Sequence, residues 1–204
     1  MDCHLHTVHS GDSVLRVAEL AERVAAERLD VVCVTDHHTL AGAHEALERD
    51  IGARVIVGEE IRTGGGEIIG LFLTERVPYV LPLAEAVRRV RAQGGLVYAP
   101  HPLDPGRSSL GAARLAALCE GGLADVVEVF NSKVRDQAWN TGAAEMAARY
   151  GVPGAAGSDA HDAYGVGAAY VEMPDFDGPR SFVAALAEGR IVGEYRDHAA
   201  WPAR

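Results

Sequence analysis

Apolar positions along this chain follow two different spacings in turn. Apolar residues at helical spacing predict helices over 14–29, 40–49, 82–94, 108–121, 134–150 and 179–188. Short apolar runs rich in β-branched residues predict strands over 30–35, 54–58, 67–73, 96–99, 125–130, 152–157 and 166–173. A further strand begins almost at Met1, and Ser13 or Asp12 is expected to cap the first helix.

The alternation predicts an α/β fold. Repeated strand–helix units of about 25 to 35 residues are typical of a mostly parallel sheet. The pattern alone leaves a closed barrel and an open doubly wound sheet as alternatives. Gly64–Gly66 lies between two predicted strands, so it predicts a hairpin turn and not a dinucleotide-binding loop. With 204 residues and no linker-like segment, we expect one domain over 1–204, with its core over about 2–190 and a short C-terminal tail.

Composition narrows the class of protein. Hydrophobic residues make up 48% and charged residues 24% of the chain, which is typical of a soluble globular protein. The net charge of −10 argues against binding to duplex nucleic acid or to an anionic membrane surface. No apolar run approaches the roughly 18 residues that span a bilayer, and no apolar signal core follows Met1, so we expect a cytoplasmic protein, with a start slightly upstream of Met1 left open. Cys3, Cys33 and Cys119 form no C-x-x-C pair, which argues against a disulfide framework or a thiolate metal site, and Cys3 and Cys33 are expected in the core.

Polar residues of catalytic type recur where predicted strands end. Seven of the nine histidines lie in or beside such ends. Because the carboxyl ends of parallel strands share one face of a sheet or barrel, these residues are expected to meet. The residues that follow the strands are His4, His6, Asp36, His37, His38, Glu59, Glu60, His101, Asn131, Asp159 and His161.

The spacing of these residues indicates metal binding. On an extended segment, His4-x-His6 and Asp159-x-His161 each direct both side chains to one side, where they can bind one ion. A set of imidazoles and carboxylates suits zinc, manganese or iron better than calcium or copper(I). There are more candidate ligands than one ion needs. A carboxylate such as Glu60 can bridge two ions, which together can act on a phosphoryl centre.

Each feature also has a simpler explanation when it is taken alone. His-x-His is a weak signal, and Thr35-Asp36-His37 is compatible with a helix-capping turn. His101 between two prolines is compatible with a rigid turn, and Ser158-Asp159 with an Asx turn. The repetition at successive strand ends favours a common site.

The five segments that carry these residues resemble a known family. DCHLHTVHSGDS, VTDHHTLAG, VGEEIRT, APHP and AGSDAH appear in the order of the motifs of the PHP (polymerase and histidinol phosphatase) family, over about residues 2 to 170. The resemblance implies a distorted (β/α)7 barrel that holds two or three metal ions at the carboxyl ends of its strands. Many members are phosphoesterases.

The resemblance also implies a ligand set. His4, His6, Glu60 and Asp159 would bind one ion, and Glu60 would bridge to a second ion held by His101. Asp12, His37 and His161 would bind a third. Where many members carry a further histidine, this chain has Glu67. If Glu67 is the ligand, the second site is richer in oxygen and favours manganese or iron over zinc. The long helical insertion of some nucleotide-cleaving members is expected to be absent between His101 and Asp159.

The function implied is a metal-dependent phosphoesterase. Water activated by the ions would attack the phosphorus of a small phosphorylated metabolite or nucleotide. Asp159 and His161 are the expected catalytic residues, and His37 or His101 is an alternative proton donor. Candidate substrate contacts are Ser10, Arg107, Asn131 and Lys133. The alternatives are a non-catalytic or regulatory metal-binding module and a hydrolase of a non-phosphate bond. The sequence leaves the substrate, the metal and the oligomeric state open.

Overall fold

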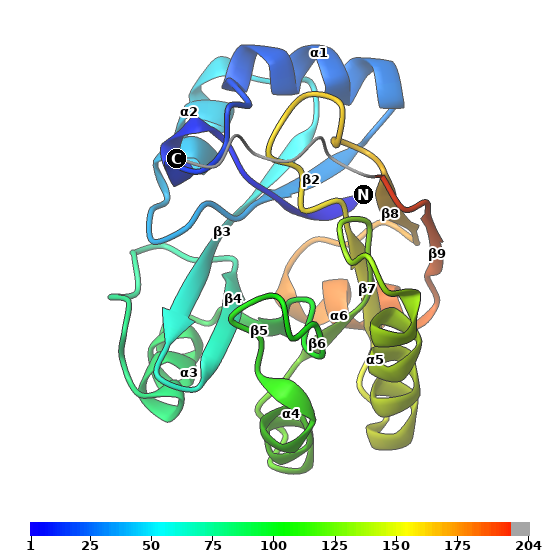
Figure 1. The fold of residues 1–204 in the computed structure, drawn as a ribbon. Coiled ribbons are helices and arrows are strands. Elements are labelled where there is room, and N and C mark those ends of the chain that lie inside the picture. Colours follow the sequence, from blue (N-terminus) through cyan, green and yellow to red (C-terminus); the bar gives the residue numbers. More distant parts are fainter. Residues whose placement is uncertain (197–204) are drawn as a thin grey trace.

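The structure is a computed structural model, in which residues 1–196 are described. Seven strands curl into a nearly closed barrel, with the helices packed outside it (Figure 1). The strands follow one another around the sheet in chain order. They are β1 (Asp2–Leu5), β2 (Val31–Val34), β3 (Arg54–Thr63), β4 (Gly66–Leu71), β5 (Leu96–Ala99), β6 (Val126–Asn131) and β7 (Gly154–Gly157). The expected distorted (β/α)7 barrel is confirmed.

One strand runs against the others. β4 pairs antiparallel with both β3 and β5, whereas the other neighbouring pairs are parallel. Thr63 and Gly66 close the β3–β4 hairpin, which confirms the turn predicted at Gly64–Gly66. Because β4 is reversed, its first residues lie at the same end of the barrel as the last residues of the parallel strands.

The barrel closes between its first and last strands. Leu5 forms a parallel bridge with Ala160, and the backbone N–H of Asp159 donates to the carbonyl of His4 at 2.7 Å. The buried carboxylate of Asp2 accepts from the backbone N–H of Ser158 at 2.9 Å. These bonds place the segment after β7 beside β1. The pair Asp159 and His161 therefore lies next to the pair His4 and His6.

The helices cover the outside of the barrel. Each one buries an apolar face, as α3 does with Ala86, Val87 and Val90 at helical spacing. The helices are α1 (Val17–Glu27), α2 (Ala41–Arg49), α3 (Leu83–Ala92), α4 (Gly111–Glu120), α5 (Gln137–Tyr150) and α6 (Pro179–Ala187), with a short 3-10 helix η1 (Val8–Ser10) after β1. The segment between His101 and Asp159 contains only such helices and strands, as expected.

Apolar side chains fill the barrel away from the polar strand ends. Ile56, Ile69 and Tyr98 belong to this interior cluster, and Phe182 of α6 packs against it. Cys3 and Cys33 are part of the same cluster, as predicted, and all three cysteines are buried and free. Within residues 1–196, no helix is both long and apolar enough to cross a membrane.

The first helix begins later than predicted. The segment 14–16 is not helical, because its polar neighbours are engaged elsewhere. The Ser13 hydroxyl donates to the carbonyls of His6 and His161, and Asp12 faces histidine side chains, so neither caps α1. Arg16 is the N-cap residue, and its backbone N–H donates to the Glu19 carboxylate.

Two strands also differ from the prediction. β3 continues to Thr63 because residues 58–63 pair with β4, although the polar Glu59 and Glu60 interrupt its apolar pattern. The predicted strand over 166–173 is shorter, β8 (Ala169–Glu172), and pairs antiparallel with β9 (Arg190–Gly193), which was not predicted. β9 occupies part of the expected C-terminal tail, whose residues 197–204 lie outside the described residues.

Candidate metal centre

Most of the residues predicted at the strand ends meet at one end of the barrel, whereas Asp36 bonds to Thr7 and Glu59 accepts from the backbone N–H of Val77. His4 and His6 are delivered by β1 and the residues that follow it, Glu60 by β3, and Asp159 by the loop after β7. Their side chains are almost fully buried. Within the described residues, imidazole and carboxylate atoms form three groups in which the atoms lie within 4.8 Å of one another.

Two of the groups are buried, and we call them the inner groups: His4 with Glu60 and His101, and His4 with His6 and Asp159. The Glu60 carboxylate lies 3.2 Å from His4 Nε2 and 3.1 Å from His101 Nε2. His4 Nε2 and His6 Nε2 are 3.0 Å apart, and both face Asp159 Oδ1, at 3.7 and 3.5 Å. Glu60 thus lies where the resemblance requires a bridging carboxylate.

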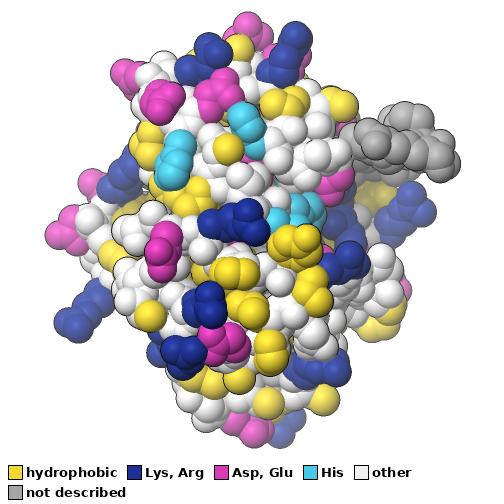
Figure 2. Space-filling model, turned by 90° about the vertical axis from the view of Figure 1, so that its left-hand side faces the viewer, with side chains coloured by type: hydrophobic (Ala, Val, Ile, Leu, Met, Phe, Trp, Pro, Cys, Tyr) yellow, Lys and Arg dark blue, Asp and Glu magenta, His cyan; other side chains and the backbone are white. Residues whose placement is uncertain are grey.

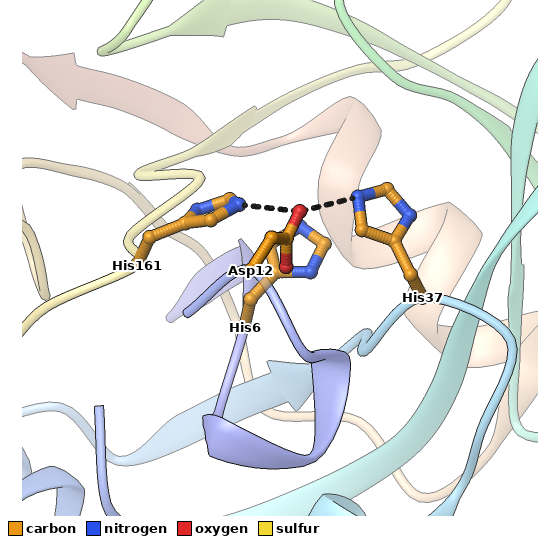
Figure 3. Close-up of side chains that lie close together, drawn as sticks. All are labelled: His6, Asp12, His37 and His161. Atoms are coloured by element: carbon orange, nitrogen blue, oxygen red, sulfur yellow. Dashed lines mark ion pairs between the residues drawn. The ribbon is translucent and has the colours of Figure 1, made fainter. Parts of the chain in front are cut away.

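The third group, the outer group, consists of His6, Asp12, His37 and His161. Figure 3 shows Asp12 between the two flanking imidazoles, with His6 beside it. Asp12 Oδ2 lies 3.3 Å from His37 Nε2 and 3.5 Å from His161 Nε2. The side chains of Asp12, His37 and His161 are 46%, 23% and 16% exposed, so this group lies between the inner groups and solvent.

The carboxylates of the inner groups are held in the anionic form. Burial alone would raise the pKa of Asp159, but the charges of Arg107 and Lys133 outweigh it and hold that pKa well below its usual range. Burial likewise acts to raise the pKa of Glu60, and His4 and His37 outweigh it and lower that pKa. Both carboxylates can therefore act as ligands at neutral pH.

The imidazoles differ in protonation. Burial, together with the nearby His161, lowers the pKa of His6 to about 3, so this ring is neutral and has a lone pair available for a metal. Burial also disfavours the charged form of His37, but Glu60 and Asp12 raise its pKa to about 9. Without an ion, positive charge is thus supplied by protonated histidines facing the carboxylates.

The arrangement of donor atoms fits divalent metal ions. Among the described residues, Asp12 Oδ1 and Asp159 Oδ1 are buried oxygens that accept no hydrogen bond. Such orphaned atoms are costly unless a cation compensates them. The close approach of His4 Nε2 and His6 Nε2 is also what two ligands of one ion require. The set of nitrogen and oxygen donors suits zinc, manganese or iron.

Glu128 was not singled out from the sequence, although it supports two of the predicted ligands. Its Oε1 lies 3.0 Å from His4 Nδ1 and accepts from the Tyr98 hydroxyl at 2.9 Å. Its Oε2 accepts from the backbone N–H of His101 at 2.6 Å and from the Asn131 amide at 2.9 Å. A carboxylate inside an apolar strand (VVEVF) was the available signal. Partners of this kind orient metal-binding imidazoles.

Three residues at or beside the site have a left-handed backbone conformation. His38, His101 and Asp159 have φ values of 59°, 28° and 51°, in the left-handed region that disfavours residues other than glycine. Such conformations cost on the order of 1–3 kcal/mol each. The surrounding hydrogen bonds, such as that from the His101 N–H to Glu128, hold the chain in these conformations.

Two predicted substrate contacts are cations beside Asp159. Arg107 lies 2.8 Å from Asp159 Oδ2. Lys133 Nζ lies 2.9 Å from His161 Nδ1 and 3.7 Å from Asp159 Oδ1. Both side chains reach the metal-binding end of the barrel from loops, as the sequence suggested.

The other two predicted substrate contacts bond to the ligand residues themselves. Ser10 Oγ accepts from the backbone N–H of His37 at 2.9 Å and lies 3.1 Å from His6 Nδ1. Asn131 is buried, and its amide donates to Glu128 and, at 3.3 Å, to Asp159. This geometry suits the orientation of ligands, so contact of either residue with a substrate stays a prediction.

Glu67 lies near the centre but belongs to none of the three groups. Its carboxylate is 3.9 Å from Arg62 Nε. Burial raises its pKa, and the negative charge of Glu60 acts in the same direction. The prediction that Glu67 binds metal is therefore not settled by this geometry. The influence of Glu60 on its pKa shows only that Glu67, at the start of β4, lies near the ligand groups.

Comparison with known proteins gives the family. The profile of the PHP domain matches residues 2–89, and a PHP-associated profile matches residues 137–191. An uncharacterized protein of Methanocaldococcus jannaschii is 39% identical over 196 residues, covering 91% of this chain and 78% of that protein. The chain belongs to the PHP family. The resemblance drawn from the five motifs is thereby confirmed.

Two further relatives show how the family varies. A 5'-3' exoribonuclease of Haemophilus influenzae is 33% identical over 96 residues, covering 44% of this chain and 35% of that protein. A two-domain protein from Bacteroides vulgatus, described as containing a predicted PHP-like metal-dependent phosphoesterase, shares the fold with a TM-score of 0.73 and 18% identity. That match covers 95% of this chain, which spans 64% of the two-domain protein. The family and the three ligand groups support a metal-dependent hydrolase.

Proposed function

We propose that this PHP protein hydrolyses the phosphate ester of a small metabolite or nucleotide at a centre of two or three divalent metal ions. The observation that carries the proposal is the convergence of the inner groups with two cations, Arg107 and Lys133, at Asp159. Imidazoles and carboxylates suit metal ions, and the cations suit the remaining oxygens of a phosphate group.

The inner groups would hold two ions through His4, His6, Glu60, His101 and Asp159. When bound, such ions activate water and neutralise phosphoryl oxygens. The residues of the chain fix the positions of these ligands. Glu128 orients His4, and Asn131 holds Asp159 through its amide.

Arg107 and Lys133 would bind phosphoryl oxygens of the substrate. Their charges are partly balanced by Asp159, and both lie at loop positions that a ligand can reach. Developing negative charge in the transition state would strengthen these contacts. Removal of either cation should therefore lower kcat as well as raise KM.

Proton transfer would involve the outer group and Asp159. His161 is the more accessible of the two proposed catalytic residues, and its Nδ1 lies 2.9 Å from Lys133 Nζ. We assign His161 to the proton delivered to the leaving oxygen and Asp159 to the proton of the attacking water. His161 would instead serve as a ligand if a third ion occupies the outer group.

The experiment is metal content by elemental mass spectrometry on untagged protein, followed by turnover of p-nitrophenyl phosphate with and without chelator. We expect two or three equivalents of manganese, iron or zinc and a turnover that chelator abolishes. Chelation should also lower Tm, because ions that bind only the folded protein stabilise it. One equivalent or none, with no turnover after Mn²⁺ is added back, would exclude the proposal.

Asp159→Asn separates the proposal from a non-catalytic metal-binding module. Both the enzyme and such a module would lose bound metal and thermal stability, but only the enzyme has a chelator-sensitive turnover that the substitution removes. Metal-dependent hydrolysis of carboxylic esters or amides without phosphatase activity would instead favour a non-phosphate hydrolase.

A further inference from the structure

A polar cavity adjoins the end of the barrel that carries the three ligand groups. It has a volume of about 390 Å³ and lies between the loop that carries Arg107 and the start of α5. Its basic lining residues are Arg107, Lys133, Arg135 and Arg196. Trp139 and Tyr195, which are 37% and 40% exposed, supply aromatic walls.

The cavity is electropositive in a protein whose net charge is −10. Its basic side chains outnumber its carboxylates, Asp104 and Asp136. Both carboxylates are engaged by the backbone: Asp104 accepts from the N–H of Gly106, and Asp136 from the N–H of Ala138 at the start of α5. On the face shown in Figure 2, basic side chains lie beside exposed histidines. An anion is the ligand that such a lining favours.

The cavity is continuous with the proposed phosphate site. Arg107 and Lys133 line it, and the same two side chains contact Asp159 at 2.8 and 3.7 Å. A substrate whose phosphate lies at the metal centre would therefore extend past these cations into the cavity.

Arg135 lies beyond that shared boundary and has no acidic partner. Among residues 1–196 it forms no hydrogen bond or ion pair, and it is exposed. Arg196, by contrast, pairs with Glu194 at 2.7 Å and donates to the carbonyl of Tyr164. Arg135 is thus the cation of this cavity whose charge the protein leaves uncompensated.

We propose that this cavity binds a second anionic group of the substrate, a phosphate or a carboxylate, through Arg135. The inference rests on the proposed function, because it places the first phosphate at the metal centre. It adds that the enzyme prefers substrates with two anionic groups over those with one, and it assigns Arg135 as a residue that determines specificity.

The test uses sets of matched phosphonates, which resist hydrolysis, bound to the metal-loaded protein and measured by calorimetry. Each set has one spacer length and ends in a methyl group, a carboxylate or a second phosphonate. At the spacer length that reaches Arg135, we expect the compounds with a carboxylate or a second phosphonate to bind about tenfold more tightly than the methyl compound. A charge-assisted hydrogen bond would give an effect of this size. The two acidic ends distinguish a carboxylate site from a phosphate site.

Arg135→Gln should remove this preference, while Arg180→Gln, which removes the same charge from the exposed face of α6, should keep it. Equal binding of methyl and acidic compounds at every spacer length would overturn the inference, as would an equal loss in both variants. If the methyl compounds also fail to bind and p-nitrophenyl phosphate is not hydrolysed, the proposed function itself has failed. If the methyl compounds bind and p-nitrophenyl phosphate is hydrolysed, but acidic compounds bind no more tightly than methyl compounds, only the assignment of the cavity is wrong.

Discussion

Glu59 and Glu60 are neighbours on β3, and both are buried, yet they lie in opposite environments. Glu60 faces the histidines of the inner groups, and His4 and His37 hold its pKa low although burial acts to raise it. Glu59 accepts a hydrogen bond from the backbone N–H of Val77 at 2.7 Å, and burial raises its pKa to about 7. Two adjacent residues thus differ in the direction of their pKa shift: it is lowered for the predicted ligand Glu60 and raised for Glu59.

The cause is the alternation of side chains along a strand. Residues at even spacing share a face, so Glu60 lies on the side of Ile56 in the barrel interior, and Glu59 on the side of Ile61 in the outer layer. The interior face meets imidazoles, whereas the outer face meets apolar side chains such as Val77. The chemistry of a glutamate in this barrel is therefore decided by its face and not by its burial.

Glu60→Gln should have the largest effect. The substitution removes the charge that faces four imidazoles and would weaken the binding of ions by the inner groups. We expect a loss of bound metal and a fall in kcat/KM well beyond the ~10–100-fold that loss of a supporting partner costs. Elemental mass spectrometry and p-nitrophenyl phosphate turnover measure the two effects.

Glu59→Gln is the matched control for that substitution. Its amide oxygen can still accept from the Val77 N–H, and its neutral side chain resembles the protonated carboxyl group. Metal content and turnover should stay close to those of the unsubstituted protein. If Glu59→Gln loses metal while Glu60→Gln keeps it, the contrast between the two faces is wrong.

Glu128→Gln should have the next largest effect. The amide cannot accept at both of its ends, so it loses a bond either to His4 Nδ1 or to the backbone N–H of His101. We expect metal affinity to fall by ~10–100-fold, with the fold retained. Competition with a metal-binding dye gives the affinity.

Tyr98→Phe is the control for Glu128. It removes the hydroxyl that donates to Oε1 but leaves the carboxylate and its bonds to the ligands. Its effect on metal affinity should be much smaller. Equal losses in the two variants would mean that packing at this position matters and that the orientation of His4 does not.

Local patterns predicted the alternation of strands and helices and the polar residues at the strand ends, whereas the closed barrel and the ligand set came from the resemblance to the PHP family. Apolar runs and turn residues placed the strands, and polar residues at their ends placed His4, His101 and Asp159. The sequence did not predict how far a strand continues past its apolar run, or which face its later residues occupy. Glu59 and Glu60 interrupt β3, so its continuation to Thr63 depends on pairing with β4, which local pattern does not encode.

Long-range partners were also outside the reach of the sequence. Glu128 contacts His4, which lies 124 positions away along the chain. Asp12 and Ser13 matched the signal of a helix cap, but contacts with the loop of His161 use both residues instead. The left-handed backbone of Asp159 follows from closure of the barrel against β1.

The protonation of Glu59 predicts a pH dependence of stability. Its pKa is raised from 4.5 to about 7 in the folded protein, which therefore binds this proton more tightly than the unfolded chain does. The free energy of unfolding should fall as the pH rises through this range, by on the order of 1–3 kcal/mol. Urea unfolding with chelator present should show Glu59→Gln matching the unsubstituted protein near pH 5 and exceeding its stability near pH 8. Parallel curves for the two proteins would contradict the raised pKa.

Glu67→Gln should have the smallest effect, and it completes the comparison of glutamates around β3 and β4. Glu67 reaches Arg62 at 3.9 Å and joins no ligand group, so its neutral analogue should keep all bound ions. Glu67→His would instead supply the histidine that many family members carry here, and should bind zinc more tightly than the unsubstituted protein. Titration of the metal-free proteins with Zn²⁺ and Mn²⁺ measures both. Loss of one equivalent in Glu67→Gln would show that this carboxylate moves into the second site when metal binds, and would make it a ligand like Glu60.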